Sequence, residues 1–467
     1  MSDISEILTI EEFSRTLRAR ETTALEVTDA CLRRIDELQP RLNAFIRVMA
    51  EDARRDAAVA DRELAEGLDR GPLHGVPIAV KDLIDIAGVP TTAASRVREG
   101  HTAAADAPVI THLRHAGAVL IGKTNLDEFA FGTTSEHSAF GGVRHPLDPT
   151  RSPGGSSGGS AVAVATGMAL AALGTDTGGS IRIPSAACGL VGLKPTIGEL
   201  STEGVVPLST TLDHIGPLCR SVEDAAILYD VLRGGSARPP GKPIDLRALK
   251  LAIPRDYFLS VLDPQVASAF DSACARLRDA GATLDDVAIP HAGDVAAIYL
   301  HIVLTEAAAY HAKTLERRSE DYTPNVRIRL EMGRYVLGED YARALRGREL
   351  IRREVDAALD GVDGLFLPAL AIPAPKIGVP IVRVGATEEP VRNVMLRCTQ
   401  AFNVSGHPAI TLPCGSTTEG LTTEGLPLGA QIIGIYQDTA GLLQVARALE
   451  SVVAARAENY LGPGRSR

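Results

Sequence analysis

The stretch from Ser152 to Ser180 constrains this chain most, because two serine-bearing glycine clusters flank one short run of apolar residues. The first cluster reads GGSSGG and the second reads TGGS. Glycine permits backbone angles and close approaches that a Cβ atom would block. We therefore expect two tight turns in which a serine hydroxyl lies beside bare backbone amides, and such amides form a hollow that holds negative charge. An oxyanion hole has this construction.

Composition narrows the class of protein. At 467 residues, with 45% hydrophobic and 23% charged residues and a mean hydropathy of +0.07, the chain is typical of a globular protein of one large α/β domain or two to three smaller ones. The formal net charge of −10 disfavours a broad basic surface. We therefore expect no nucleic acid among its partners.

The sequence favours a cytoplasmic protein without a membrane partner. The first residues, MSDISEILTIEEF, are acidic and amphipathic, unlike a secretory signal. The longest apolar run, 161–173, is shorter than the roughly 20 residues that a membrane span needs. Six cysteines without a CxxC pair predict buried thiols and neither a disulfide framework nor a zinc ribbon. His112 and His115 lack a third ligand at useful spacing, so we expect no metal site.

Hydrophobic periodicity predicts alternating strands and helices, and hence a parallel or mixed sheet covered on both faces. Residues 8–66 have helical spacing, and we expect them to form an N-terminal helical layer. GGSARPPG at 234–241 resembles a linker, although we do not take it as a domain boundary. We expect strands in IAVK, AGAVLIGKTN, SIRIPSAACGLVGLKPT, LKLAIP, TLDDVAIP, GLFLPALAIPAP, PAITLPCG and LGAQIIG, and helices at 107–115, 161–173, 222–233, 264–280, 295–360 and 439–456.

Two familiar roles for the glycine clusters fit poorly. GGSSG satisfies the G-x-S-x-G pattern of a nucleophile elbow, but the residues before it, RHPLDPTRSP, cannot form the central strand that an elbow follows. No histidine partner suggests itself, since His407 is better interpreted as a loop residue. A phosphate-binding P-loop is also disfavoured, because G-x-x-x-x-G-K-[ST] is absent.

Lys81 ends the IAV strand. From this segment alone, a surface lysine that pairs with Asp82 or Asp85 is the favoured interpretation. A serine nucleophile without histidine needs another base, however, and a lysine kept neutral by burial can serve. Lys81 is therefore a candidate base.

The segments PLHGVPIAVKD, GKTNLDEFAFGTT, SPGGSSGGSA and LGTDTGGSIRIPSAACGLVGLKPT resemble the amidase signature family, whose members hydrolyse carbon–nitrogen bonds of amides. The late segments NVSGHPAITLPCG and GLPLGAQIIG are also similar to that family. The resemblance implies an α/β fold with a central mixed, mostly parallel sheet covered by helices on both faces. It also implies a single domain over 1–467, in which 1–66 form the helical layer and 234–395 a variable, mostly helical region on the substrate side.

By its motifs, the resemblance implies a triad and its surroundings. Ser180 would be the nucleophile, Ser156 the bridging serine with a cis peptide bond, and Lys81 the base, with no cofactor. The implied oxyanion hole uses the backbone amides of Thr177, Gly178, Gly179 and Ser180. Ser157, Thr175 and Arg182 match supporting positions, and Phe131, Gly132 and Thr133 match a loop that touches substrate in relatives.

The family also contains the glutaminase subunit of the tRNA-dependent amidotransferase, and residues 107–220 are similar to it. That subunit carries an aspartate for the amino group of glutamine where Leu396 stands here by ungapped alignment, and this chain lacks an SNLARYDG-like run. We therefore expect a stand-alone amidase, monomeric or homodimeric, for a small amide or carbamate (urethane) substrate, with some esters also plausible. The glutaminase subunit is the alternative. A non-catalytic binding subunit is disfavoured because Lys81, Ser156 and Ser180 are all intact.

Overall fold

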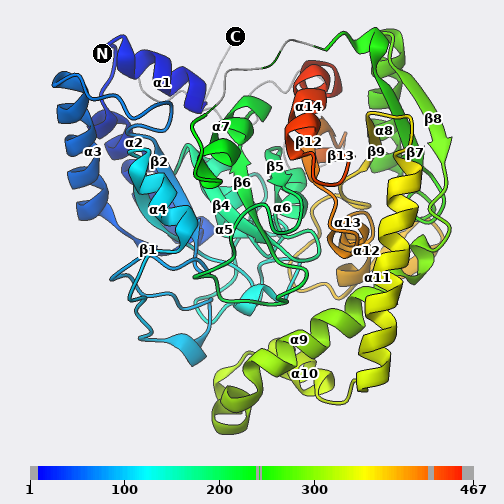
Figure 1. The fold of residues 1–467 in the computed structure, drawn as a ribbon. Coiled ribbons are helices and arrows are strands. Elements are labelled where there is room, and N and C mark those ends of the chain that lie inside the picture. The colour runs from blue at the N-terminus through cyan, green and yellow to red at the C-terminus, as the bar shows by residue number, and fades with distance from the viewer. Residues whose placement is uncertain (1–8, 238–240, 242–243, 419–424, 455–467) are drawn as a thin grey trace.

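One eleven-stranded sheet organises the computed structural model, which describes residues 9–237, 241, 244–418 and 425–454 (Figure 1). Helices flank this sheet, and the N-terminal helices lie at one end of it, far from β8 at the other. In spatial order the strands are β1 (Phe45–Val48), β3 (Val119–Thr124), β2 (Pro77–Lys81), β4 (Ala171–Asp176), β6 (His214–Cys219), β5 (Val191–Lys194), β12 (Ala409–Ser416), β13 (Pro427–Ile433), β9 (Gly364–Pro368), β7 (Lys250–Pro254) and β8 (Thr283–Val287).

The sheet is mixed, which confirms the predicted α/β class. Its parallel pairs form two groups, β3–β2–β4 and β9–β7–β8. The described strands between and beyond these groups pair antiparallel, so the expected mostly parallel pairing holds only within the two groups. Parallel neighbours need a crossover connection, which α4 (Pro108–His115) provides between β2 and β3.

The N-terminal segment forms the expected helical layer, with α1 (Ile10–Arg18), α2 (Ala24–Leu42) and α3 (Ala50–Ala65). Thr9 and Thr23 are the N-cap residues before α1 and α2, and each forms a capping box with the glutamate three residues later. The sequence analysis missed β1, a four-residue strand between α2 and α3 that pairs with β3. Four residues are too few for a clear alternation of apolar and polar positions.

The serine- and glycine-rich stretch folds differently from the expected single helix between two clusters. The helix α5 (Gly158–Ala165) ends early, and Gly167, with a φ of 73°, lets the chain turn into β4. The expected strand over SIRIPSAACGLVGLKPT is instead α6 (Arg182–Cys188) followed by β5, with Gly189 at a φ of 70° between them. The sequence analysis assigned no strand to 214–219, which form β6. Short buried apolar runs do not distinguish helix from strand.

Among its described residues, the region 234–395 contains long helices, all before residue 360, and five strands. In Figure 1, α9 (Val295–Arg318), α10 (Pro324–Gly333) and part of α11 (Gly338–Ala358) project below the sheet. The segment 292–321 has the length and apolar composition of a membrane span, but 44% of its most apolar window is buried inside the protein. Part of the linker-like 234–241, namely 238–240, lies outside the described residues.

The other elements are α7 (Val222–Leu232), α8 (Pro264–Asp279), β10 (Ile381–Val384), β11 (Thr387–Pro390), α12 (Val391–Leu396), α13 (Gln400–Val404), α14 (Thr439–Val453) and the short 3-10 helices Arg96–Arg98, Glu128–Ala130, Leu246–Ala248, Ala292–Asp294 and Ser319–Asp321.

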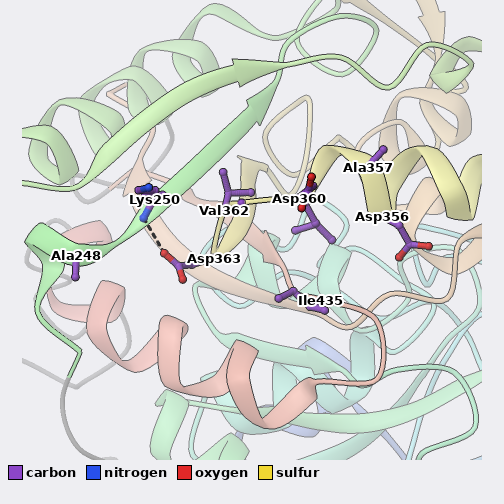
Figure 2. Close-up of a pocket in the computed structure, with 10 residues that line it drawn as sticks. Ala248, Lys250, Asp356, Ala357, Asp360, Val362, Asp363 and Ile435 are labelled. Atoms are coloured by element: carbon purple, nitrogen blue, oxygen red, sulfur yellow. Dashed lines mark hydrogen bonds between the residues drawn. The ribbon is translucent and has the colours of Figure 1, made fainter.

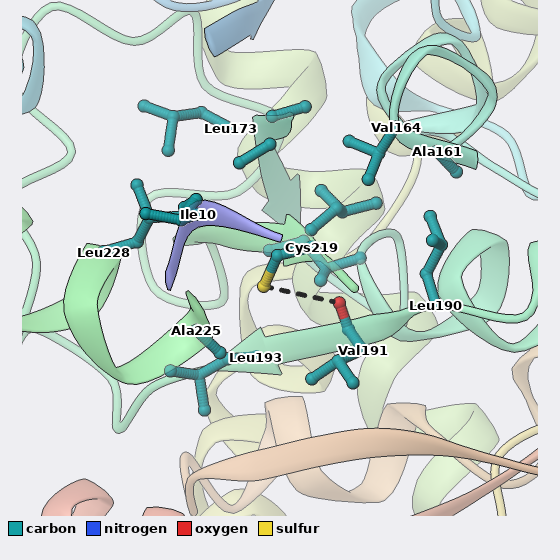
Figure 3. Close-up of a cluster of buried hydrophobic side chains, with 14 of the residues drawn as sticks. Ile10, Ala161, Val164, Leu173, Leu190, Val191, Leu193, Cys219, Ala225 and Leu228 are labelled. Atoms are coloured by element: carbon teal, nitrogen blue, oxygen red, sulfur yellow. Dashed lines mark hydrogen bonds between the residues drawn. The ribbon is translucent and has the colours of Figure 1, made fainter. Parts of the chain in front are cut away.

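A large apolar cluster fills the space between the middle of the sheet and the helices over it. Figure 3 shows Leu173 of β4 and Leu193 of β5 in this cluster, together with Ile10 of α1 and Leu228 of α7. Cys219 lies among them, and all six cysteines are free and buried, as predicted. This packing fixes β4, and with it the turn that follows β4.

Candidate active site

Lys81 is the last residue of β2, and its side chain is completely buried. Its Nζ donates to three hydroxyl oxygens, at 2.9 Å to Ser156 Oγ, 2.8 Å to Ser157 Oγ and 2.8 Å to Thr175 Oγ1. The interpretation of Lys81 as a surface residue paired with a nearby aspartate is therefore wrong. Asp82 instead lies 3.0 Å from Nζ of the buried Lys123.

The environment of Lys81 suits a group that gains and loses a proton near neutral pH. Burial lowers the pKa of Lys81 to about 7, although the negative charges of Asp127, Asp176 and Asp213 act in the opposite direction. The three partners of Nζ are neutral hydroxyls. A substantial fraction of Lys81 is therefore uncharged at neutral pH and can accept a proton.

The first glycine cluster forms a loop that leads from Ser152 into α5, and the peptide bond between Gly155 and Ser156 is cis. Space around this loop is so restricted that side chains would collide. A Cβ atom at Gly155 would lie 2.6 Å from Asp127 Oδ2, and one at Gly158 would lie 2.4 Å from Ser135 Oγ. The hydroxyl of Ser135 also donates to the carbonyl oxygen of Ser156 at 3.2 Å. The glycines thus let the loop approach its neighbours closely.

The second cluster forms the turn between β4 and α6, from Thr177 to Ser180. The carbonyl oxygen of Gly178 in this turn is held by a hydrogen bond, since Thr399 Oγ1 donates to it at 2.6 Å. Thr177 Oγ1 donates to Asp213 Oδ1 at 2.6 Å. Among the residues that the structure describes, the amides of Gly178, Gly179 and Ser180 donate no hydrogen bond. Backbone N–H groups that donate no other hydrogen bond and are held in a rigid turn can stabilise an oxyanion.

The two clusters meet at Ser180. The amide of Ser157 donates to the carbonyl oxygen of Ser180 at 3.2 Å, and the side chain of Ser180 is almost buried. Because Ser157 and Ser156 both contact Lys81 Nζ, the structure brings the three residues of the predicted triad into one small region.

Arg182, which follows the turn in the sequence, stabilises it through buried contacts. Its Nε donates to Asp176 Oδ2 at 3.0 Å, and both side chains are fully buried. Burial alone would raise the pKa of Asp176, but the positive charge of Arg182 holds it below its usual range. The guanidinium also donates to Asn403 Oδ1 at 2.6 Å and Gln431 Oε1 at 3.0 Å. Arg182 therefore joins the turn to α13 and β13.

The predicted substrate loop, Phe131, Gly132 and Thr133, directly follows the short 3-10 helix Glu128–Ala130 and is largely buried. Its conformation depends on Asp127, whose carboxylate accepts from the amides of Thr134 and Ser135, at 3.2 and 2.8 Å. A Cβ atom at Gly132 would lie 2.3 Å from Asp127 Cγ. The loop thus wraps closely around this carboxylate.

The sequence analysis missed several residues of the site. Asp127 lies in the motif GKTNLDEF and Asp176 in LGTDTGGS. A carboxylate within an apolar or glycine-rich run could have marked both as candidate site residues. Tyr299, Asp213 and Thr399 had no such signal, because they come from distant segments. Tyr299 lies so close to the turn that a Cβ atom at Gly178 would be 2.7 Å from its Oη.

A separate surface pocket lies between the end of α11 and the start of β7 (Figure 2). Asp356, Asp360 and Asp363 line it together with Lys250, whose backbone amide donates to Asp363 Oδ2 at 2.8 Å. None of the predicted site residues lines this pocket. Over the described residues, no group of three or more His, Cys, Asp or Glu side chains is placed to hold a metal ion.

Comparisons with known proteins agree with this geometry. The amidase family matches residues 26–443. The chain is 41% identical to an amidase of Pseudomonas putida, with 90% of this chain and 92% of the relative aligned. It is 40% identical to a subunit of the glutamyl-tRNA(Gln) amidotransferase of Chloroflexus aurantiacus, with 95% and 96% aligned. A solved structure of an amidase is 38% identical and superposes with a TM-score of 0.89, over 96% of this chain and 100% of the other. The chain is an amidohydrolase of the amidase signature family.

Proposed function

We propose that this chain is a stand-alone amidase that hydrolyses small carboxylic amides through an acyl-enzyme on Ser180. The contact between Lys81 Nζ and Ser156 Oγ, at 2.9 Å inside a fully buried site, is the observation that carries the proposal. It joins a hydroxyl to a lysine whose pKa of about 7 suits proton transfer near neutral pH.

In the proposed first step, neutral Lys81 takes the proton of Ser156, and Ser156 takes that of Ser180. The Oγ atom of Ser180 forms a bond to the amide carbonyl carbon. When the carbon–nitrogen bond breaks, the proton returns through Ser156 to the departing amine, and an ester on Ser180 remains. Water then attacks this ester with the same base and releases the carboxylic acid.

The turn from Thr177 to Ser180 would hold the negative charge that develops on the carbonyl oxygen. The uncommitted amides of Gly178, Gly179 and Ser180 support this role. Ser157 and Thr175 would keep Lys81 in place through their hydrogen bonds to Nζ. Phe131, Gly132 and Thr133 would contact the substrate from the neighbouring loop.

The alternative is a glutaminase subunit of a tRNA-dependent amidotransferase, the kind of enzyme to which the Chloroflexus relative belongs by name. Leu396 argues against it, since a Cβ atom at Gly178 would lie 3.0 Å from Leu396 Cδ2. An apolar side chain therefore stands beside the turn, where an amino group would need a carboxylate. The intact Lys81, Ser156 and Ser180 argue against a non-catalytic binding subunit.

We further propose that residues 1–467 act as one domain in the cytoplasm, as a monomer or homodimer, on a small amide or carbamate. The urethane and ester activities follow from the mechanism, which needs only a carbonyl group with a leaving group that can accept a proton.

The experiment that tests the proposal measures product release from an aryl amide, an aliphatic primary amide, an aryl carbamate and glutamine, with the Ser180→Ala protein as blank. Turnover of members of the first three without glutamine supports a stand-alone amidase. Turnover of glutamine alone, especially with a requirement for partner subunits, would favour the glutaminase. If none of the four compounds is turned over in a Ser180-dependent way, both the amidase and the glutaminase proposals are contradicted.

A further inference from the structure

Glu306, in the middle of α9, binds a loop that lies about a hundred residues earlier in the chain. Its Oε2 accepts from Ser209 Oγ at 2.6 Å and from the amide of Thr211 at 3.1 Å. Its Oε1 accepts from Thr211 Oγ1 at 2.8 Å and from the hydroxyl of Tyr341, on α11, at 2.9 Å. One carboxylate therefore joins this loop to two helices of the region that projects below the sheet in Figure 1.

Asp213 holds the other end of the same loop, which we call the 208–213 loop. Its Oδ2 accepts from the amides of Leu208 and Ser209, at 2.9 and 3.1 Å. The amide of Asp213 in turn donates to the carbonyl oxygen of Ser209 at 2.9 Å. Ser209 is thus bound by two carboxylates, by Asp213 through its amide and by Glu306 through its hydroxyl. The shape of the 208–213 loop therefore depends on both carboxylates.

The 208–213 loop contacts the turn from Thr177 to Ser180, which we call the oxyanion turn. The second oxygen of Asp213, Oδ1, accepts from Thr177 Oγ1 at 2.6 Å. The next residue, His214, begins β6 and pairs with Asp176, the last residue of β4 before the turn. The hydrogen bond from Thr177 therefore helps to set the direction in which the oxyanion turn leaves the sheet.

The charges of the two carboxylates also act on each other. Burial raises the pKa of Asp213 to about 6, and the negative charge of Glu306 acts in the same direction. The hydrogen bonds from Thr177 and from the amides of Ser209 and Leu208 act in the opposite direction. A buried carboxylate is costly unless donors meet it, so the position of Asp213 is tied to the position of these three donors. Movement of the 208–213 loop would therefore move Asp213, and with it Thr177.

We propose that Glu306 and Asp213 are positioning residues for the oxyanion turn, so that the alignment of its amides depends on the attachment of the 208–213 loop to α9 and α11. This inference rests on the proposed amidase function. In the described part of the chain, the hydrogen bonds of Glu306 go to the loop and to Tyr341, and none goes to the triad. Glu306 would therefore act only through Asp213 and the turn. Misaligned amides stabilise the oxyanion less, which slows the chemical step more than it weakens the binding of a planar amide.

The kinetic test removes the carboxylate of Glu306 and leaves the triad and the oxyanion turn unchanged. We expect kcat on an aryl amide to fall about 10-fold or more in Glu306→Ala, with little change in KM. Glu306→Gln should retain most of kcat, because its carbonyl oxygen can still accept from Ser209 and from the amide of Thr211. Its NH2 group can donate to the hydroxyls of Thr211 and Tyr341, which also act as acceptors.

Glu316→Ala is the matched control, since Glu316 lies on the same helix with 63% of its side chain exposed. It should behave as the parent protein. Ser209→Ala removes a single hydroxyl from the same network, and kcat should fall there too, which keeps the test valid if Glu306→Ala does not fold. A rise in KM with unchanged kcat would overturn the proposal. So would equal losses of kcat in Glu306→Gln and Glu306→Ala, or parent kinetics in both Glu306→Ala and Ser209→Ala.

Hydrogen exchange separates this proposal from the proposed function, because it requires no turnover. It is measured on the Ser180→Ala protein over two segments, 206–213 and 181–183. In the second segment, the amide of Ile183 donates to the carbonyl oxygen of Gly179 at 2.7 Å, so its exchange reports on the turn. We expect exchange in both segments to become about 10-fold faster or more in Ser180→Ala/Glu306→Ala but not in Ser180→Ala/Glu316→Ala.

Faster exchange in both segments supports the positioning role even if no amide is hydrolysed, in which case only the proposed function fails. The helix α2 serves as the internal reference, because it lies in the N-terminal layer and should not change. Faster exchange in 206–213 alone would show that Glu306 holds the loop without affecting the turn, and would overturn the proposal. An equal increase in α2 would also overturn it, since this result would indicate general destabilisation.

Discussion

Thr399 Oγ1 donates a 2.6 Å hydrogen bond to the carbonyl oxygen of Gly178. Because the C=O and N–H of one planar peptide unit point in opposite directions, this bond directs the amide of Gly179 away from Thr399. Asn403, from the next helix, donates to the carbonyl oxygen of Asp176 at 3.0 Å. Two side chains late in the sequence therefore set the orientation of the turn that ends at Ser180.

The Thr399→Val protein tests whether this anchoring matters for the reaction. Valine keeps the shape of threonine but removes the donor, so the peptide unit is free to rotate. We expect kcat to fall about 10-fold or more with little change in KM, since removal of one oxyanion donor costs about 100- to 1000-fold. Steady-state kinetics on an aryl amide measures both constants. Thr399→Ser retains the hydroxyl and should retain activity, and equal losses in both variants would refute the anchoring role.

Replacement of Ser180 by alanine should remove nearly all hydrolysis and leave the fold intact. Ser180 is the proposed nucleophile, on which the ester would form. Circular dichroism checks the fold, and product release measures the activity. His407→Gln is the control, since His407 is engaged with Asp356 and Ser405, at 3.0 Å each, away from the serines of the triad. Undiminished hydrolysis by the Ser180 variant would rule out the mechanism.

The rate should depend on pH through Lys81. The mechanism needs the neutral amine, and burial lowers the pKa of Lys81 to about 7. Below that pH lysine is protonated, so kcat/KM on a neutral aryl amide should fall about tenfold for each pH unit, and above it the rate should level off. Measurements from about pH 5 to 9 test this shape. Lys81→Met should abolish the activity, and a flat profile across the range would contradict the assignment of Lys81 as base.

The buried pair of Arg182 and Asp176 should matter for stability as well as for the turn. In Arg182→Met, Asp176 would remain buried without its counter-charge, and breaking such a pair costs about 3–5 kcal/mol. Urea unfolding measures the loss. The double variant Arg182→Met/Asp176→Asn should be more stable than Arg182→Met, because the unpaired charge is gone. Arg343→Met, which breaks an exposed pair with Asp340, should cost less than about 1 kcal/mol.

The sequence predicted the parts of this site that lie in contiguous motifs. The glycine clusters around Ser156 and Ser180 and the buried strand before Lys81 were identified by residue type and spacing, and the structure brings them together. Their secondary structure was harder to predict, since α6 and β4 are short and buried throughout. Thr399 and Tyr299 could not be predicted, because their role depends on how α9 and the start of α13 pack against a turn more than a hundred residues earlier in the chain.

The close contact between Gly178 and Tyr299 gives a last prediction about the shape of the site. An alanine at 178 would place its Cβ 2.7 Å from Tyr299 Oη, so either the turn or the tyrosine must move. We expect Gly178→Ala to lose most of its kcat, while Gly338→Ala, whose Cβ would meet nothing within 4 Å, should behave as the parent protein. Removal of the hydroxyl oxygen relieves the shortest contact and leaves Leu396 Cδ2 and Tyr299 Cζ at 3.0 Å from the added Cβ, so Gly178→Ala/Tyr299→Phe should regain part of the lost activity. Because the two changes share one contact, their effects on kcat should be non-additive, and additive losses would show that the glycine is required for another reason.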